Sequence, residues 1–487
     1  MKPAPLTRFL CFLLIFAFAI PQSWATCGGG GGGGVGGMGG GSMSSQETYQ
    51  VPWKMMKPED QVKEGLVVYW FPSSSEEVVK SSLRNSRILS LYASQCVTMG
   101  VADARTSIGQ KLAAGEKLPV AVLATPEGAV VTKVINKDGK LKVDQLEKAL
   151  ETEMKRREEA LEEKMKSAKD KAKAGDNQSA IGIYRAVLEQ KCLFPKKAKD
   201  AAKELRKLGA NEVADLIDAP VFTPVFDHAA SVRIEKTMNR GLAAEMKDNY
   251  SEAVRLYSAA HRMDPADPVP MRYLGEVYRH HTGEWEKART AFEAILKMPA
   301  DPLSRAVALH GLGKMTIHEG DFKKGLSLME SSVQVYPIAL AYRNLAVYWN
   351  SEGDQKKAGE YTKLALSLDP TDQFNLVFAA AFMAGTGNGD EALKIARENE
   401  NLMPASYNLA AVYAQLGQKE KALALLKRHF FQYERYQSVR AKEMMEARVD
   451  AVFASINHDP AFVALTSGAD GRLPIPSFPG MKPAGTN

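Results

Sequence analysis

One short pattern recurs through the second half of this chain and constrains its fold more than any other feature. A glycine, four polar or aromatic residues and a small residue occupy 283–288, 320–325, 353–358 and 417–422. Prolines follow the successive units at Pro265, Pro299, Pro337, Pro370 and Pro404. Because proline cannot continue a helix, these positions separate one unit from the next. Such self-similarity indicates stacked supersecondary units, since one helical hairpin cannot bury its apolar face alone.

A second pattern precedes these turns. The segments 273–278, 344–348 and 408–413 each contain a leucine, a small residue and then a tyrosine three or four positions after the leucine. The leucine and the tyrosine share one face of a helix, and the small residue lets a second helix approach closely. Alanines that end the turns do the same from the second helix, at Ala253, Ala288, Ala358, Ala392 and Ala422.

Together these patterns resemble the tetratricopeptide repeat (TPR), whose period is about 34 residues. The resemblance implies an all-α TPR superhelix, an α-α solenoid, of about six repeats over 233–432. A degenerate hairpin and a connecting region are expected over 174–232, capping helices over 433–467 and a disordered tail over 468–487. Single units depart from the pattern at Gly325, at Thr316, at Met383 and at the added pair His280-His281.

The resemblance also implies a concave groove lined by the first helix of each unit. The groove candidates are Arg272, Arg279, His310, Lys314, Arg343, Asn344, Asn350 and Asn408, with Glu276 and Tyr407 among them. Family members that hold a peptide C-terminus use Asn with Lys or Arg, and Arg343 with Asn344 partly resembles that clamp. An extended or acidic peptide, or a partner protein, is therefore the expected ligand. An ordinary solvated concave face is the alternative.

Residues 49–150 have the pattern of a small α/β domain. The continuous apolar run 66–71, between Gly65 and Pro72, predicts a buried strand. Serines followed by glutamates over 73–77 predict the start of a helix. Further strands are predicted over 88–92, 120–123 and 130–135, and further helices over 108–112 and from 143 onward.

This order of elements resembles thioredoxin, through the segment 69–72, the pair Leu118-Pro119 at the place of the thioredoxin cis-proline, and the turn 125–128. The two redox cysteines of that family would fall at Ser74 and Glu77. Disulfide exchange needs an attacking thiolate and a resolving thiol, so we expect no catalytic residues and no enzyme activity. The predicted fold class is α+β overall, with a thioredoxin-like α/β domain before the TPR superhelix.

The chain begins with the features of a secretory signal peptide, predicted over 1–25. Lys2 and Arg8 precede an apolar run over 9–20, and Ser23-Trp24-Ala25 provides small residues for cleavage. The run is shorter than the ~20 residues of a spanning helix, which leaves an uncleaved anchor as the alternative.

Cys27 opens a glycine-rich stretch, and residues 26–48 are predicted to be a disordered tether. This arrangement resembles a bacterial lipoprotein, although Trp24 and Thr26 depart from the usual lipidation motif. We expect an exported protein of the periplasm or cell envelope. It would contact a membrane only through a lipid on Cys27.

Two further cysteines, Cys96 and Cys192, remain in the mature chain. One pair among three cysteines is no disulfide framework, so we expect two separate buried thiols, with a disulfide between them as the alternative.

A charged helix without Gly or Pro is predicted over 151–173 as the link between the two halves, with a two-stranded coiled coil as the alternative. The 63 basic residues nearly balance 57 acidic ones and form no uninterrupted block, so no nucleic acid is expected. No HExxH, zinc-spaced Cys/His set, P-loop, dinucleotide fingerprint or GxSxG is present, so we expect no metal and no cofactor.

These observations predict a non-enzymatic protein–protein interaction scaffold. The alternatives are a thiol-redox or chaperone accessory protein and a lipoprotein that assembles an outer-membrane complex. The oligomeric state and the partner stay open.

Overall fold

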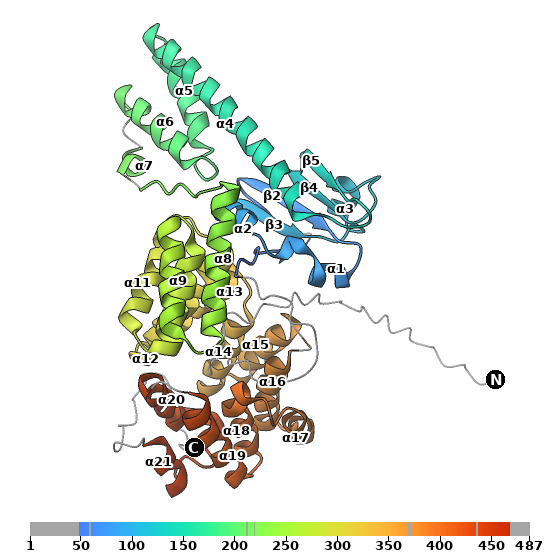
Figure 1. Cartoon of the computed structure of the whole chain (residues 1–487), viewed down its shortest axis with the longest axis vertical. Coiled ribbons are helices and arrows are strands. Elements are labelled where there is room, and N and C mark those ends of the chain that lie inside the picture. Colours follow the sequence, from blue (N-terminus) through green and yellow to red (C-terminus); the bar gives the residue numbers. More distant parts are fainter. Residues whose placement is uncertain are drawn as a thin grey trace, which may run out of the picture.

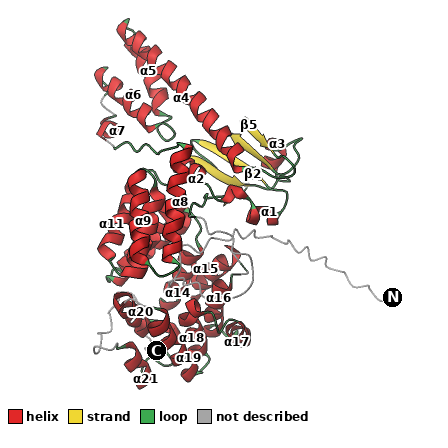
Figure 2. Ribbon diagram, in the orientation of Figure 1, coloured by secondary structure: helices red, strands yellow, loops and turns green. Residues whose placement is uncertain are grey.

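The computed structural model describes residues 48–467, except 58–59, 211–212, 219, 369, 371 and 435–436. It consists of a small mixed sheet with its helices, a projecting helical arm and a stack of helical hairpins (Figures 1 and 2). The predicted signal peptide, Cys27, all but the last residue of the predicted tether and the predicted C-terminal tail lie outside the described residues. Within the described part of the chain, no helix is both long and apolar enough to cross a bilayer.

The sheet has five strands among the described residues, in the order β1-β3-β2-β4-β5. Strand β2 is buried along its whole length. It pairs in parallel with β3 and antiparallel with β4. Its bounds match the predicted apolar run, which confirms that prediction. The strands are β1 (Lys54–Met55), β2 (Leu66–Phe71), β3 (Val97–Val101), β4 (Val120–Ala124) and β5 (Val130–Ile135).

Three helices of the α/β domain lie between these strands, namely α1 (Ser75–Lys80), α2 (Arg87–Ser94) and α3 (Ser107–Leu112). The predicted strand over 88–92 is wrong, because this segment is part of α2. The Ser86 side chain caps the helix by accepting a hydrogen bond from the Leu89 amide. Almost every residue of α2 is buried, and a short helix that is buried on all sides has the same apolar run as a buried strand. The Leu118–Pro119 peptide bond is cis.

Helix α4 (Val143–Lys173) starts beside the sheet and continues without a break into the arm. There it packs against α5 (Asn177–Leu188), which packs in turn against α6 (Pro195–Lys207) and, through it, α7 (Ala214–Asp218). One apolar cluster runs from the sheet along α4 to these helices and includes Leu150, Leu161 and Tyr184. The apolar stripe of the charged helix is therefore covered within the chain.

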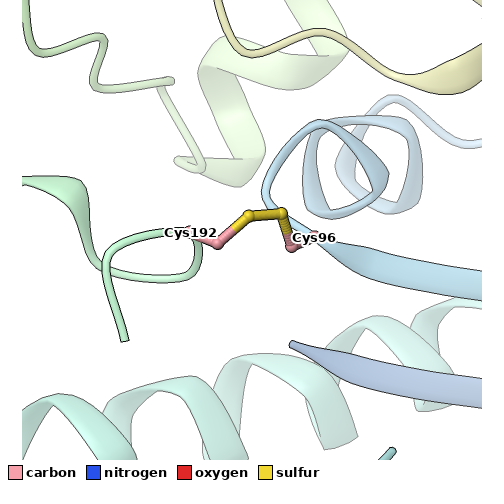
Figure 3. Close-up of a disulfide and its surroundings, with 2 residues drawn as sticks. All are labelled: Cys96 and Cys192. Atoms are coloured by element: carbon pink, nitrogen blue, oxygen red, sulfur yellow. A yellow bond between two sulfur atoms is a disulfide. The ribbon is translucent and has the colours of Figure 1, made fainter. Parts of the chain in front are cut away.

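Cys96 and Cys192 form a disulfide, with their Cα atoms 5.8 Å apart (Figure 3). The expectation of two separate thiols is therefore wrong. Cys96 directly precedes β3, and Cys192 lies in the turn between α5 and α6. The turn between α5 and α6 folds back onto the amino end of β3 and brings Cys192 to Cys96. The number of cysteines in the sequence could not predict this long-range contact. The bond joins the arm to the α/β domain.

Helical hairpins follow one another from α8 to α19, and six of them are present over the described part of 228–428. The two helices of each hairpin are joined by a tight turn and pack against each other, and each hairpin packs on the next hairpin. Their paired helices are α8 (His228–Glu245) and α9 (Tyr250–Met263), α10 (Pro268–Glu276) and α11 (Trp285–Lys297), α12 (Pro302–His318) and α13 (Phe322–Val335), α14 (Ala339–Ser351) and α15 (Gln355–Leu368), α16 (Gln373–Gly385) and α17 (Gly389–Glu398), and α18 (Ser406–Gln415) and α19 (Lys419–Arg428).

The small residues behave as the pattern predicts. A Cβ atom added to Gly275 would lie 2.4 Å from the Phe292 ring, which belongs to the second helix of the same hairpin. At Gly325, which replaces the expected alanine, an added Cβ would lie 2.6 Å from the Gly313 carbonyl oxygen, so the two helices of this unit leave no room for a methyl group. The added pair His280-His281 falls in a π-helical turn, η2 (Val277–Thr282), which accommodates the extra residue.

Helices after α19 close the stack. The chain passes through η4 (His429–Tyr433), α20 (Gln437–Val449), η5 (Ala451–Phe453) and α21 (Pro460–Thr466). The end segment packs on the last hairpin, where Phe453 and Phe462 are fully buried in the same cluster as Leu426. Helix α20, in contrast, turns back along the array.

A buried ionic cluster joins the α/β domain to the first hairpins. Arg87, at the start of α2, has no exposed side-chain area. Its guanidinium donates to Asp264 and, over 2.9 Å, to Asp267. It also donates to the Val225 carbonyl and the Ser231 hydroxyl, each over 2.8 Å. These contacts dock the two parts of the molecule on each other.

Candidate functional site

Helix α20 lies across the first helices of the middle and last hairpins. Its Glu446 carboxylate accepts hydrogen bonds from Lys314 Nζ, at 2.9 and 3.3 Å, and from the Tyr348 hydroxyl, at 3.3 Å. His318 lies 3.6 Å from the same carboxylate. Lys314 and His318 belong to α12 and Tyr348 to α14, so one acidic side chain ties α20 to two hairpins.

Beneath α20 lies a cavity of about 70 Å³, here called the α20 cavity. Side chains from α12, α14, α16, α18 and α20, and from the start of η5, line it. One wall is apolar and contains Phe374, Phe378 and Phe382 of α16. The carboxylates of Glu443 and Glu446 of α20, and of Asp450 just after that helix, also line it, at intervals of three and four residues.

The structure brings most of the predicted groove residues to this cavity. Lining it are Lys314, Arg343, Asn344, Asn350 and Asn408, together with Tyr407. Several already have partners within the chain. Arg343 donates to the Asn375 side chain over 2.6 Å, and its guanidinium lies over the Phe374 ring at 4.5 Å. The groove is therefore partly satisfied from within, and its polar side chains are less solvated than the sequence suggests.

The remaining candidates lie elsewhere. Arg279 forms an ion pair with Glu276, at 3.0 Å, inside the second hairpin. His310 is fully buried and shares a 2.8 Å hydrogen bond with the Asn344 side chain. Burial by itself raises the pKa of the Glu276 carboxyl, but the Arg279 guanidinium outweighs burial and lowers this pKa to about 2. This cluster is a packed, charged part of the core and offers no open surface.

Arg272 contacts a second segment of the same chain. Residues 48–53 run in an extended form past the first hairpins, and the Thr48 carbonyl accepts from Arg272, at 3.4 Å, and from the Tyr273 hydroxyl, at 3.3 Å. The Tyr49 hydroxyl donates to Asp267 over 2.6 Å, which links this segment to the Arg87 cluster. The array thus holds an extended segment of its own chain at one end and a helix at the other.

Charged groups at the α20 cavity shift the pKa values of the Glu446 and Asp450 carboxyls. Burial raises the pKa of Glu446, but the Lys314 ammonium and His318 outweigh it and hold the value at about 2. Burial, together with the Glu446 charge, raises the pKa of Asp450 to about 6. Asp450 accepts from the Tyr407 hydroxyl over 3.1 Å. At neutral pH the Lys314–Glu446 pair is ionised, while Asp450 titrates just below neutrality.

Ser74 and Glu77, where the resemblance to thioredoxin would place redox cysteines, have structural roles in α1. The Ser74 hydroxyl caps the helix by accepting from the Glu77 amide over 3.2 Å. The Glu77 carboxylate accepts from the Ser73 amide and hydroxyl, both at 2.7 Å. The Ser74 hydroxyl therefore caps α1, the Glu77 carboxylate holds the preceding Ser73, and neither side chain supplies a thiol.

Among the described residues, one group of side chains has the composition of a metal-ligand set. Glu64, Cys96 and Cys192 place three potential ligand atoms within 4.8 Å of one another. Because the two sulfur atoms are joined in a disulfide, neither is a thiolate, and a carboxylate alone is a weak site. The sequence patterns missed this grouping, since the cysteines are separated by 96 positions.

Comparison with curated proteins gives partial matches. The chain is 26% identical to "Protein CTR9 homolog" of Arabidopsis thaliana over 262 residues, which cover 43% of this chain and 22% of that protein. It is 28% identical to "Photosystem I assembly protein Ycf3" of Rippkaea orientalis over 123 residues, which cover 22% of this chain and 69% of that protein. The chain thus spans about a fifth of the length of the first relative.

Solved structures with similar helical arrays include a thermophilic TPR protein of Thermus thermophilus, with 19% identity, a TM-score of 0.31 and coverage of 39% of this chain and 99% of that one. Yeast Tom70 matches with 12% identity, a TM-score of 0.26 and coverage of 64% and 83%. The family model of the tetratricopeptide repeat matches residues 238–305, the region from α8 to α12. With the hairpins described above, this match shows that the chain contains tetratricopeptide repeats.

Proposed function

We propose that this protein is an exported, non-enzymatic scaffold that binds a segment of a partner protein in its TPR groove, at the α20 cavity. The observation that carries the proposal is the occupant already there. Helix α20 lies on a surface formed by four hairpins, and its Glu446 carboxylate accepts from Lys314, one of the side chains that the repeat pattern predicts for a ligand. Because this surface already binds a helix of its own chain, it has the shape and the polar groups to bind a similar helix of a partner protein.

The groove has the physical features of a peptide site. Stacked hairpins hold it in shape before a ligand arrives, which lowers the ordering cost of binding. The α16 phenylalanines offer an apolar anchor, and Lys314, Asn344 and Asn408 offer polar contacts beside it. A partner that replaces α20 would present carboxylates at helical spacing, as a helix laid in a groove. A segment that forms no helix is the second form of ligand, since residues 48–53 lie against the first hairpins in that way and offer the Thr48 carbonyl to Arg272 and Tyr273.

A disulfide supports export. Disulfides persist in oxidising compartments outside the cytosol, and Cys96–Cys192 links two parts of the chain 96 positions apart. The predicted signal peptide points the same way. Attachment through a lipid on Cys27 and a role in assembling a membrane complex remain part of this proposal. The Ycf3 relative is named as an assembly protein, which supports that class of role.

We also infer that the α/β domain is thioredoxin-like. Helices α1 and α2 lie between the parallel strands β2 and β3, and α3 leads to the antiparallel β4 and β5 and then α4; this order supports the inference. A thiol-redox accessory role would have to use Cys96–Cys192, because Ser74 and Glu77 occupy the expected redox positions. Titration of the native protein with a thiol reagent, before and after mild reduction, separates the roles. A disulfide that is reduced at the potential of a cellular oxidoreductase would favour the redox role.

The groove proposal is tested with a labelled peptide of residues 437–450, the α20 segment. The Glu446→Lys variant of the full chain sets two cations against each other at Lys314 and should release α20. We expect this variant to bind the peptide in fluorescence anisotropy, while the wild type binds it at least tenfold more weakly because its own α20 competes. Hydrogen exchange of the α20 amides should accelerate in parallel.

The matched control is Glu420→Lys, which makes the same charge change at a glutamate on α19 whose side chain is 86% exposed. It should behave as the wild type. In the exchanged pair Lys314→Glu with Glu446→Lys, α20 should dock again and peptide binding should be lost. Equal peptide binding by the wild type and the Glu446→Lys variant would reject the groove as the site.

A further inference from the structure

The positive charge of this protein is concentrated in the arm. Residues 164–207 contain thirteen Lys and Arg against five Asp and Glu, a net charge of +8, whereas the whole chain carries +6. The remaining sequence is therefore slightly acidic. These residues form the far part of α4, all of α5 and α6, and the turns between them. In Figure 1 this arm projects away from both the sheet and the hairpins.

Helix α6 presents its cations on one face. Lys196, Lys199, Lys203 and Arg206 follow one another at intervals of three and four residues, which places them in one stripe. The opposite face consists of Ala198, Ala201, Ala202 and Leu205, which are buried. The burial of that face fixes the rotation of the helix, so the basic stripe points outward.

Acidic groups of α4 and α6 pair with lysines of α6, and two of them, Glu162 and Glu158 of α4, lie 2.5 and 3.5 Å from Lys197, beside the stripe. The two acidic residues of α6 pair with neighbouring lysines, Asp200 with Lys203 at 3.2 Å and Glu204 with Lys207 at 2.6 Å. Helix α6 keeps a net charge of +4 after both are counted. The far end of α4 adds exposed cations at Lys164, Lys166, Lys169 and Lys173.

The arm is held in place by two connections. Helix α4 is continuous from the sheet to the tip, and the Cys96–Cys192 disulfide ties the turn before α6 to the amino end of β3. Such a body presents its charges as a preformed surface, without the ordering cost of a disordered basic tail.

The arm offers no apolar anchor. The exposed large apolar side chains of the described residues lie in the sheet, the hairpins and the end segment, and none lies between 143 and 218. Tight protein interfaces depend on buried aromatic and apolar anchors, so a purely cationic face fits a partner whose charge is spread over a surface. An anionic bilayer is such a surface, and it attracts each Lys and Arg near it.

We propose that the arm formed by α4, α5 and α6 docks on an anionic phospholipid bilayer. Residues on the tip and on the α6 stripe face the lipid phosphates, and the rest of the molecule projects into solution. The sequence is compatible with this placement. Cys27, the candidate lipid attachment point, lies 21 positions before Thr48, so a fully extended chain would keep Thr48 within about 70 Å of the bilayer. The arm would provide the second contact that stable attachment needs.

The test uses sedimentation with vesicles and the chain from residue 26 onward carrying Cys27→Ser, so that no lipid group contributes. Vesicles contain phosphatidylcholine alone, or phosphatidylcholine with 30% phosphatidylglycerol. We expect binding to the anionic vesicles only, with a steep loss as NaCl rises from 50 to 300 mM. The triple variant Lys196→Gln, Lys203→Gln, Arg206→Gln should lower the partition coefficient by about tenfold or more.

The matched control is Lys323→Gln, Lys356→Gln, Lys394→Gln, which removes three exposed charges from the hairpins instead. It should retain binding within about twofold, because these lysines lie outside the arm. Equal losses in the two triple variants would assign binding to net charge and overturn the proposal. Binding to polyglutamate without binding to the anionic vesicles would assign the arm to an acidic protein and would also overturn it.

Discussion

Replacement of Arg87 by methionine tests whether the ionic cluster holds the α/β domain on the repeat array. The substitution keeps most of the aliphatic bulk and removes the charge. It leaves Asp264 and Asp267 buried without their cation, and it leaves the Val225 carbonyl and the Ser231 hydroxyl without a donor. The Arg87 side chain has no exposed area, and its two acidic partners have at most 1%. Water therefore cannot replace the lost contacts.

The expected loss is about 3–5 kcal/mol, the range for breaking a fully buried ion pair from one side. This is a large share of the roughly 5–15 kcal/mol that stabilises a typical domain. The loss depends on pH. Burial raises the pKa of Asp267, and the Arg87 guanidinium, which lowers it, is gone in the variant, so the folded pKa of Asp267 lies still further above that of the unfolded chain. The folded state then binds more protons in acid, so the deficit shrinks as the pH falls from 7.5 towards 4.5.

The assay is urea unfolding followed by circular dichroism at 222 nm, at pH 7.5 and at pH 4.5. Arg105→Met is the matched control, because the Arg105 side chain is 88% exposed beside Asp103 and should leave the midpoint unchanged. In the triple variant Arg87→Met, Asp264→Asn, Asp267→Asn the uncompensated charges are gone, and part of the stability should return. A loss below about 1 kcal/mol for Arg87→Met, or a loss that does not change with pH, would refute the reasoning.

Three further outcomes follow from single sites. The Cys96→Ser variant, which leaves Cys192 unpaired, should lose about 2–4 kcal/mol in urea unfolding, and the wild type in reductant should show the same loss. Gly275→Ala should cost about 1–3 kcal/mol because its Cβ would overlap an aromatic ring of α11, while Gly182→Ala, with open space around the Cβ, should be neutral or slightly stabilising in the same thermal melts. Because burial raises the folded pKa of Asp450 to about 6, this carboxyl contributes stability that is lost as the pH rises from 4 to 7, so the free energy of unfolding of the wild type minus that of Asp450→Asn should fall over this range in denaturant titrations at several pH values.

Much of the architecture could be predicted from the sequence because its determinants are local. The turn at 353–358 and the leucine–tyrosine spacing at 345–348 repeat within one helical hairpin, and every hairpin packs on its neighbour. The strand at 66–71 is equally local, since its apolar run is bounded by a glycine and a proline. Even the added residue at 280–281 marks its own π-helical turn. The prediction of a strand over 88–92 is wrong because a short apolar run fits a buried helix as well as a buried strand.

The candidate site divides in the same way. The repeat register brings Lys314, Asn344 and Asn408 to one surface, and the structure places all three on the α20 cavity. Nothing in the local pattern indicates that Glu446, 132 positions from Lys314, returns to cover that surface. A groove that is open in the sequence is therefore partly filled in the folded chain.

The sequence alone determined the periodicity and the small residues at helix contacts, because each depends on neighbours within a few tens of residues. Only the tertiary structure decided the Cys96–Cys192 pairing, the burial of Arg87 between two parts of the chain and the return of α20 to the groove. These contacts join residues 96 to 180 positions apart. Over such separations the choice among many partners depends on how the stacked layers bring surfaces together, and no local periodicity encodes that choice.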